Sequence, residues 1–320
     1  MIKSSVLSST LAYALVAVTE RAAVAAGRTA GRGDEQAADA AAFAAMHAAL
    51  GEIDMAGRVV VSPDGREGSQ LLATGQTVGR GKAPELDVAL DPLEGTTLTA
   101  KAMENALSVL AVAPRGGLMH VPAIYMEKLA VGPGFSRDVV DIDAPPGENA
   151  LRLAKAKGVD VREITVCVLD RPRHEKIIAD LRKAGARVNL IGDGDIAGVI
   201  YTAKPETGVD MYLGQGKAPE GVLAAAALKC VGGQMQARLV FRSEAERARA
   251  EMSGARDLNR RYHLDELVSG EAIFVATGVT KGGLLDGVKR THGVVHTHSL
   301  LMSSVDGASR TIRSVTPALD

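Results

Sequence analysis

The residues most able to do chemistry are gathered in one heptapeptide, Asp91-Pro92-Leu93-Glu94-Gly95-Thr96-Thr97. Two carboxylates stand three residues apart after an apolar run, and a glycine and two threonines follow them. Carboxylate oxygens are the ligands that Mg²⁺ and Mn²⁺ prefer, and free N–H groups at the start of a helix attract phosphate. A turn with solvated acids is the competing interpretation. The order of strand, acids, glycine and hydroxyls favours a site for a divalent cation and a phosphate.

Several elements must position this heptapeptide. An apolar strand over Leu86–Leu90 runs directly into it, and further strands are expected at Arg58–Val61 and Leu107–Ala113. Residues 8–50 are expected to form two alanine-rich helices joined by a polar turn, with the second beginning near Glu35. The loop after Val61 is rich in Pro, Gly, Ser and Asp, which is typical of irregular structure.

The second half of the chain alternates between strand and helix patterns. Strands are expected at 164–170, 186–191 and 209–214, and helices follow at 173–185, 196–203 and 217–233; two last strands are expected near 275 and at 311–316. This alternation predicts an α/β layer with ligands at the carboxyl ends of the strands. The length of 320 residues suggests about two domains. Because Pro145-Pro146-Gly147 breaks the pattern, we expect domains at 1–150 and 151–320.

Charge and composition exclude some classes of partner. The chain has 37 Lys and Arg against 38 Asp and Glu, so no global basic field is available for nucleic acid or an anionic membrane. The apolar run Leu11–Val18 is short and Glu20-Arg21 follows it, so we expect a helix of a soluble protein rather than a signal or a membrane span. Cys167 and Cys230 lie in apolar runs, which indicates buried thiols and a reducing, cytoplasmic location.

Two other motifs have weaker claims to a function. Gly192-Asp193-Gly194-Asp195-Ile196-Ala197 matches a dinucleotide-binding pattern, but two aspartates would face the pyrophosphate. His296 and His298 would share one face of a strand and suggest zinc, although a solvated strand or loop is the simpler interpretation. Neither motif displaces the heptapeptide as the main site.

The heptapeptide resembles the D-P-I/L-D/E-G-T/S signature of the lithium-sensitive, metal-dependent sugar and inositol phosphatases. Glu94 together with TAKAMENALSVLAV, YMEKLAVGPG, RPRHEKII and APEGVLAAAALKC makes the chain similar to class II fructose-1,6-bisphosphatase, from about Ala17 to Arg313. The resemblance implies an α/β (α+β) fold, a layered α-β-α-β-α sandwich of two domains with the active site between them. It also implies hydrolysis of the 1-phosphate of fructose-1,6-bisphosphate in gluconeogenesis; whether sedoheptulose-1,7-bisphosphate is a second substrate stays open.

The resemblance also implies roles for individual residues. The metal ligands, for Mg²⁺ or Mn²⁺, would be Asp39, Asp91, Glu94 and Glu220. The substrate would be bound by Glu94, Gly95, Thr96, Tyr125, Arg171, Pro172, Arg173, Asp193, Gly194, Asp195 and Lys217. Thr96 and Glu67 would serve the attacking water. The expected partners are a sugar bisphosphate and further copies of the chain, as a dimer or tetramer.

Three positions depart from the family. Pro63 stands where the family sequence V-V/I-G-E-G-E has a metal-binding glutamate, and Asp64 or Glu67 would have to replace it. Lys217 replaces a small residue that contacts substrate, and Glu35 stands where many members have a basic residue. A catalytically impaired relative, acting as a sugar-phosphate sensor or structural subunit, is therefore the alternative to an active enzyme.

Overall fold

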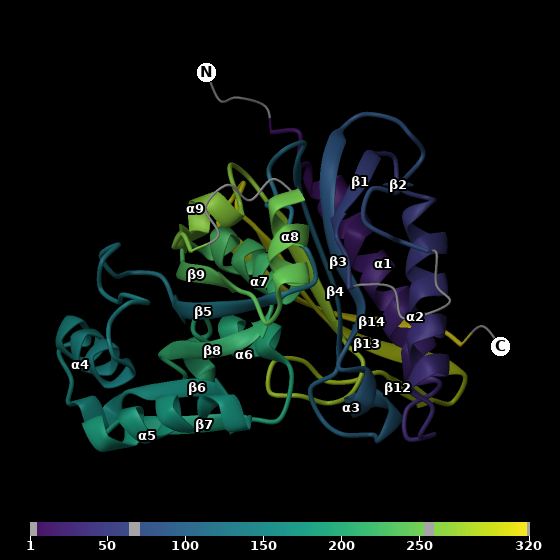
Figure 1. Cartoon of the computed structure of the whole chain (residues 1–320). Helices are drawn as coiled ribbons and strands as arrows, with labels where there is room; N and C mark the ends of the chain where they lie inside the picture. The colour runs from purple at the N-terminus through teal and green to yellow at the C-terminus, as the bar shows by residue number, and fades with distance from the viewer. Residues whose placement is uncertain (1–4, 64–70, 253–258, 319–320) are drawn as a thin grey trace. The chain divides into compact units, whose positions relative to one another are not determined.

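The computed structural model describes residues 5–63, 71–252 and 259–318. The chain divides into two compact units, which we call unit 1 (residues 1–119 and 268–320) and unit 2 (residues 120–267). Each unit is described by itself below, with its elements labelled as in Figure 1.

Unit 1 begins with two long helices, α1 (Ser9–Gly27) and α2 (Glu35–Leu50), which pack side by side. Both start at a side-chain cap, because the side chains of Ser8 and Asp34 accept hydrogen bonds from backbone N–H groups in the first turn. The predicted pair of alanine-rich helices, with the second starting at Glu35, is therefore confirmed.

The sheet of unit 1 has eight strands. They are β1 (Ala56–Val61), β2 (Thr77–Val78), β3 (Glu85–Glu94), β4 (Leu107–Pro114), β11 (Ile273–Gly278), β12 (Lys289–Thr291), β13 (Val294–Ser303) and β14 (Ala308–Pro317). Their order is β12-β13-β11-β4-β3-β1-β2, and β14 pairs with β13. β1 and β3 are parallel, and all other pairs are antiparallel.

The core of unit 1 lies between the two helices and this sheet. Leu15 and Met46 of the helices join Leu90, Leu110 and Val275 of the sheet in one buried cluster. By length and hydropathy, α1 alone among the described helices could cross a membrane, yet half of its apolar window is buried inside the structure. This burial is what a core helix of a globular unit shows.

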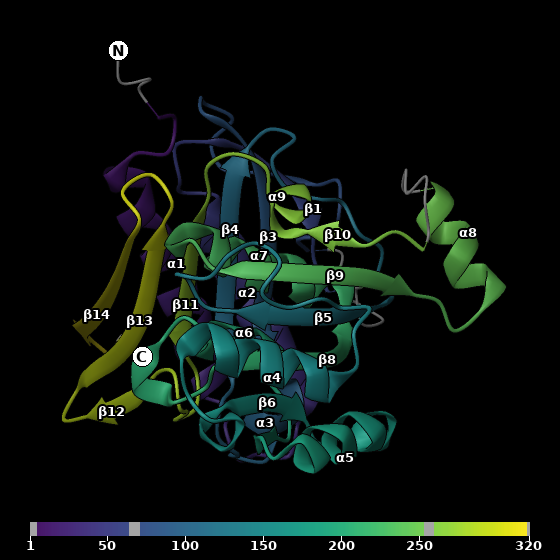
Figure 2. The same cartoon turned by 90° about the vertical axis from the view of Figure 1, so that its left-hand side faces the viewer.

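Unit 2 contains a six-stranded sheet in the order β10-β9-β5-β8-β6-β7, part of which can be followed in Figure 2. Its strands are β5 (Tyr125–Val131), β6 (Thr165–Leu169), β7 (Arg187–Ile191), β8 (Met211–Lys217), β9 (Gln234–Val240) and β10 (Tyr262–His263). β6 is parallel to β7 and β8, whereas β5 is antiparallel to β8 and β9.

The helices of unit 2 include two pairs that pack on this sheet. They are α4 (Pro146–Lys157), α5 (Glu175–Ala184), α6 (Asp195–Tyr201), α7 (Ala218–Val231), α8 (Glu244–Met252) and α9 (Leu264–Leu267), with short 3-10 turns at Val161–Glu163, Pro172–His174 and Pro205–Thr207. α4 and α5 share a buried cluster with Leu129 of β5, whereas Gly221 of α7 lies against Met126 and Lys128 of the same strand. Because side chains alternate along a strand, the two helix pairs cover opposite faces.

The expected fold class is confirmed, since the chain combines helices with two sheets. The division of the chain differs from the expected 1–150 and 151–320, because unit 2 begins at His120 and residues 268–320 return to the sheet of unit 1. Pro146 does not separate domains. It is the first residue of α4, a position where the missing N–H of proline costs no hydrogen bond.

Both cysteines are free and buried, as expected. Burial raises the pKa of the Cys167 thiol to about 12. A thiol with such a pKa is almost wholly protonated at neutral pH and is a poor nucleophile. Cys167 is therefore part of the core rather than a catalytic group.

Candidate active site

The heptapeptide forms the expected junction of strand and helix. β3 ends at Glu94, Gly95 adopts a left-handed conformation with φ of 90°, and the short helix α3 (Thr96–Ala100) follows. A β-bulge falls between Asp91 and Glu94, which changes the register against β4. The two carboxylates are only 8% and 4% exposed. The local sequence thus delivers two acidic side chains into a buried position.

Helix α2 brings two more acids to the same junction. The hydroxyl of Thr96 donates to Oδ1 of Asp39 over 3.4 Å. The hydroxyl of Thr97 donates to Oε1 of Glu35 over 2.8 Å. The structure therefore brings Asp39 beside the heptapeptide, as predicted, and gives Glu35 a hydrogen-bonding role there.

Small apolar side chains allow this close approach of α2. A buried cluster beneath the junction consists mostly of alanines: Ala23, Ala26, Ala38, Ala42, Leu93, Leu98, Ala106 and Val279. Alanine has no side-chain rotamers to restrict, so helices lined with it can pack tightly at little entropic cost. The alanine bias of residues 8–50 thus serves to place Asp39 beside β3.

The donor set of this junction suits a hard divalent cation. Asp91 and Glu94 offer buried carboxylate oxygens, and a buried carboxylate gains most from a nearby positive charge. Within the described residues, no group of three or more His, Cys, Asp or Glu side chains is close enough to hold a metal ion. The chemistry of the donors fits Mg²⁺ or Mn²⁺, and the complete set of four ligands stays a prediction.

Unit 2 contains a second buried group of charges. Asp195 begins α6, Glu220 lies in the first turn of α7, and the ammonium of Lys128 forms an ion pair with Asp195. Lys128 and Asp195 are 1% and 3% exposed. Burial raises the pKa of Glu220 well above its usual value, and the adjacent Asp195 carboxylate raises this pKa further, while Lys128 opposes the shift.

This arrangement argues against a dinucleotide site at the glycine-rich turn. Gly194 has φ of 86° and Asp195 follows it, as in the sequence pattern. The Asp195 carboxylate points inward to Lys128 instead of leaving the helix start open for a pyrophosphate. The acid is therefore part of a buried charge cluster.

Cationic side chains surround Tyr125 in unit 2. The guanidinium carbon of Arg242 lies 3.3 Å from the centre of the Tyr125 ring, and that of Arg173 lies 5.3 Å from it. Lys217 is directly opposite Tyr125 in the pairing of β5 with β8, and its side chain is 56% exposed. Three cations beside one tyrosine are suited to hold a phosphate.

Arg173 is oriented by the backbone. Its Nε and Nη2 atoms donate to the carbonyl oxygen of Gln215 over 3.1 and 2.8 Å. His174 next to it is buried, and Nε2 of its ring accepts from the N–H of Gln215 while Nδ1 lies 2.8 Å from the Leu169 carbonyl. Both ring nitrogens are occupied, so His174 joins β6 to β8 and has no catalytic role.

The loops that follow the parallel strands β6 and β7 lie together, as the strand pattern predicts. Nη2 of Arg171 lies 4.0 Å from Oδ1 of Asp193. Pro172 begins the 3-10 turn after β6, and Gly194 ends the loop after β7. The predicted residues of both loops therefore meet at the carboxyl ends of these strands.

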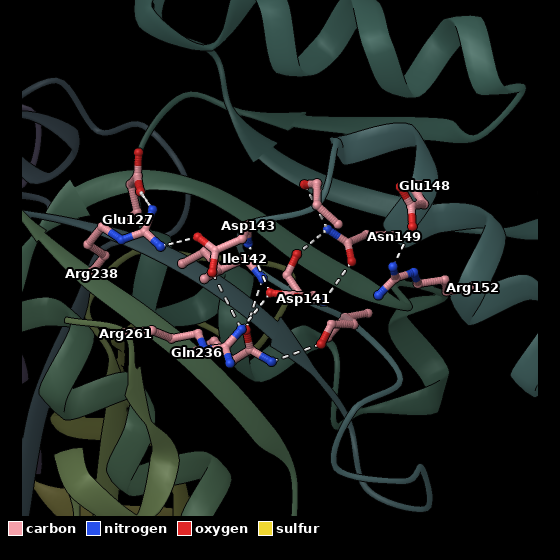
Figure 3. A network of polar contacts seen from close by, with 12 residues as sticks. Glu127, Asp141, Ile142, Asp143, Glu148, Asn149, Arg152, Gln236, Arg238 and Arg261 are labelled. Carbon is pink, nitrogen blue, oxygen red and sulfur yellow. Dashed lines mark hydrogen bonds and ion pairs between the residues drawn. The ribbon is translucent and has the colours of Figure 1, made fainter. Parts of the chain in front are cut away.

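A polar network in unit 2, shown in Figure 3, fixes the segment 141–143. Arg238 forms ion pairs with Asp143 and, over 3.5 Å, with Glu127. The side chain of Asn149 accepts from the N–H of Asp141 and donates to its carbonyl, each over 2.8 Å. A cavity of about 290 Å³ lies beside the network and is lined by Arg173, Arg238 and Asp143 among others.

The structure thus gathers the predicted residues into two groups. Unit 1 holds Asp39, Asp91, Glu94, Gly95 and Thr96, and unit 2 holds Tyr125, Arg171, Pro172, Arg173, Asp193, Gly194, Asp195, Lys217 and Glu220. Glu67 and Asp64 lie outside the described residues. Pro63 follows the end of β1 and is half-buried.

Sequence reasoning missed two members of the unit 2 group. Arg242 was detectable as a basic residue just past the end of an alternating strand, in the sequence VFRSE. Lys128 stands between Glu127 and Leu129 in a strand that is otherwise apolar after Glu127, and a charge inside an apolar strand is a signal of a buried partner.

Comparison with known proteins gives a consistent result. The family described as "Bacterial fructose-1,6-bisphosphatase, glpX-encoded" matches residues 9–316. A protein of Synechococcus sp. named "D-fructose 1,6-bisphosphatase class 2/sedoheptulose 1,7-bisphosphatase" is 39% identical, covering 97% of this chain and 95% of its own. The "Fructose-1,6-bisphosphatase 1 class 2" of Escherichia coli is 38% identical, covering 95% of this chain and 94% of its own.

Proposed function

The chain belongs to the family of bacterial class 2 fructose-1,6-bisphosphatases, and from this premise we propose that it hydrolyses the 1-phosphate of fructose-1,6-bisphosphate. The products are fructose-6-phosphate and inorganic phosphate, which places the reaction in gluconeogenesis. The observation that carries the proposal is the junction after β3, where Asp91 and Glu94 are buried and Thr96 contacts Asp39.

The family implies a requirement for a divalent metal ion. We propose Mg²⁺ or Mn²⁺ as the ion, with Asp39, Asp91, Glu94 and Glu220 as ligands. When bound, such an ion polarises a phosphoryl oxygen and lowers the pKa of bound water.

The other residues have roles that follow from their chemistry. Arg173 and Lys217 are proposed to bind phosphate, the first through a planar guanidinium that its contact with Gln215 holds in place. Asp193 and Asp195 are proposed to accept hydrogen bonds from sugar hydroxyls. Thr96, whose hydroxyl lies 3.4 Å from Asp39 Oδ1 and 3.3 Å from the Leu93 carbonyl, is proposed to orient the attacking water together with Glu67.

The test is phosphate release from fructose-1,6-bisphosphate by the purified protein with Mg²⁺ or Mn²⁺. We expect turnover that EDTA abolishes and that added metal restores. Hydrolysis that ignores EDTA, or none with any divalent ion, contradicts the proposal. Binding of the substrate without turnover identifies the impaired relative that the departure at Pro63 allows.

Three finer points belong to the same proposal. Sedoheptulose-1,7-bisphosphate is proposed as a second substrate, supported by the name of the Synechococcus relative, and the same phosphate assay compares the two sugars.

A cytoplasmic location is supported by two free, buried thiols. A homo-oligomer, dimer or tetramer, is proposed by analogy with the family and is checked by light scattering of the purified protein.

A further inference from the structure

A lysine that no assigned role explains lies at the centre of unit 2. Lys128 is 1% exposed, pairs with Gly214 in the ladder between β5 and β8, and points toward α6 and α7. Its ammonium contacts two groups, the carboxylate of Asp195 and, over 3.1 Å, the carbonyl oxygen of Lys217. One side chain therefore joins the start of α6 to the point where α7 begins.

Two glycines shape the surroundings of this side chain. A Cβ atom at Gly216 would lie 2.0 Å from Oδ2 of Asp195 and 2.8 Å from Nζ of Lys128. A Cβ atom at Gly221 would lie 2.4 Å from Sδ of Met126 and 3.5 Å from Cδ of Lys128. Neither glycine has the positive φ that would itself require glycine. The missing side chain at Gly216 leaves room for the ion pair, and the missing side chain at Gly221 leaves room for Met126.

Stability does not account for such an arrangement. A buried ion pair loses its hydration, and replacing it with apolar residues of similar size is often neutral or stabilising. The two groups that Lys128 contacts instead both belong to predicted substrate-binding residues, Asp195 and Lys217. An ammonium held beside Asp195 restricts the rotamer of that carboxylate, and a fixed orientation is what an acceptor for a hydroxyl needs.

We propose that Lys128 is a positioning residue for the sugar: it holds Asp195 as an oriented acceptor for a substrate hydroxyl and ties it to the backbone at Lys217. The inference rests on the proposed function. It adds a residue that touches no substrate and acts on the sugar through Asp195. The Lys128 side chain is the same length as a methionine to within one atom, so its charge can be removed with little change in volume.

The test is a double-mutant cycle with Lys128→Met, Asp195→Asn and the double variant. Loss of a hydrogen bond to a charged group predicts a rise in KM for fructose-1,6-bisphosphate of about tenfold to a hundredfold in each single variant, with a smaller change in kcat because the contact is present in both ground and transition states. The KM of the double variant should be no higher than that of the single variant with the higher KM, because the two substitutions remove the same interaction. Calorimetry of fructose-6-phosphate binding in the presence of EDTA measures the same double-mutant cycle without turnover.

The matched control is Lys157→Met, which removes a lysine paired with Asp210 on the surface of unit 2. Its KM should equal that of the wild type. A wild-type KM in Lys128→Met, or effects that multiply in the double variant, overturns the inference. An inactive wild type counts against the proposed function instead, and the binding cycle then still tests Lys128.

A second comparison covers the case in which Lys128→Met does not fold, because it leaves the Asp195 carboxylate buried alone. The double variant has no such charge and should fold. Its affinity for fructose-6-phosphate is then compared with that of Asp195→Asn. Equal affinities support the inference, and weaker binding by the double variant overturns it.

Discussion

The predicted role of Asp91 in turnover can be separated from its contribution to stability. Its Oδ1 accepts the N–H of Leu93 over 3.1 Å, a contact that asparagine can keep. We expect Asp91→Asn to lower kcat by at least about a hundredfold, the scale of losing one electrostatic contact to the transition state. The free energy of unfolding, measured by thermal denaturation, should stay within about 1 kcal/mol of the wild-type value.

The control for this prediction is Asp54→Asn, which changes an exposed carboxylate that pairs with Arg80 in the same unit. It should have the kcat of the wild type. Equal turnover in Asp91→Asn and Asp54→Asn would show that Asp91 does not bind the metal ion.

Pro63 allows a gain-of-function prediction. The predicted alignment with the family places a metal-binding glutamate at this position. Pro63→Glu should therefore lower the Mn²⁺ concentration for half-maximal activity, because an added carboxylate offsets repulsion between neighbouring ions. The measurement is a metal titration of the phosphatase rate. Pro63→Gln provides the neutral control, and identical titration curves for both variants would show that this position does not reach the metal.

The sequence predicts site residues best where the residues that share a site are also neighbours in the chain. Asp91, Glu94 and Thr96 are neighbours in the chain, and Asp39 could be added through the family resemblance. Arg242 and Lys128 lie far along the chain from their partners. The pairing of β5 with β9 brings Arg242 to Tyr125, and the packing of α6 against β8, the neighbour of β5, brings Asp195 to Lys128. Spacing within the sequence carries no information about such contacts.

At the scale of elements, the polar network around α4 is the feature that the sequence concealed. β5 and β9 were not predicted, because Glu127, Lys128, Gln236 and Arg238 interrupt their apolar pattern. In the structure these side chains have specific partners: Gln236, for example, accepts from the N–H of Ile142 and donates to the Val140 carbonyl. Polar residues inside strands are compatible with burial when each has a partner, which periodicity cannot reveal.

This network makes a stability prediction for α4. Asn149 is 1% exposed, and Asn149→Ala leaves the N–H and carbonyl of Asp141 without their side-chain partners. We expect a loss of about 1–3 kcal/mol in the free energy of unfolding, measured by urea denaturation. Arg152→Ala on the same helix removes only an exposed pair with Glu148 and should change stability by less than about 0.5 kcal/mol. Equal effects of the two substitutions would show that the network carries no stability.

At the scale of the whole molecule, the sheet of unit 1 depends on both ends of the chain. β11 pairs with β4 on one side and with β13 on the other, so residues 268–320 complete a sheet begun before residue 119. Removing residues 268–320 should therefore abolish the folded structure of unit 1, seen as lost cooperative thermal unfolding or insoluble protein. A chain ending at Pro317 keeps all eight strands and should unfold like the wild type. Cooperative unfolding of unit 1 in the shorter chain would contradict the strand order.

The same strand order has a consequence for synthesis on the ribosome. Helix α1 packs on β11 and β13 as well as on β3 and β4, yet it is made more than two hundred residues before β11. While residues 120–267 are translated, this long apolar helix has only part of its sheet to cover it. At about 5–20 residues per second this interval lasts at least several seconds. The nascent chain thus presents an amphipathic, alanine-rich helix for chaperones to bind until the last fifty residues emerge.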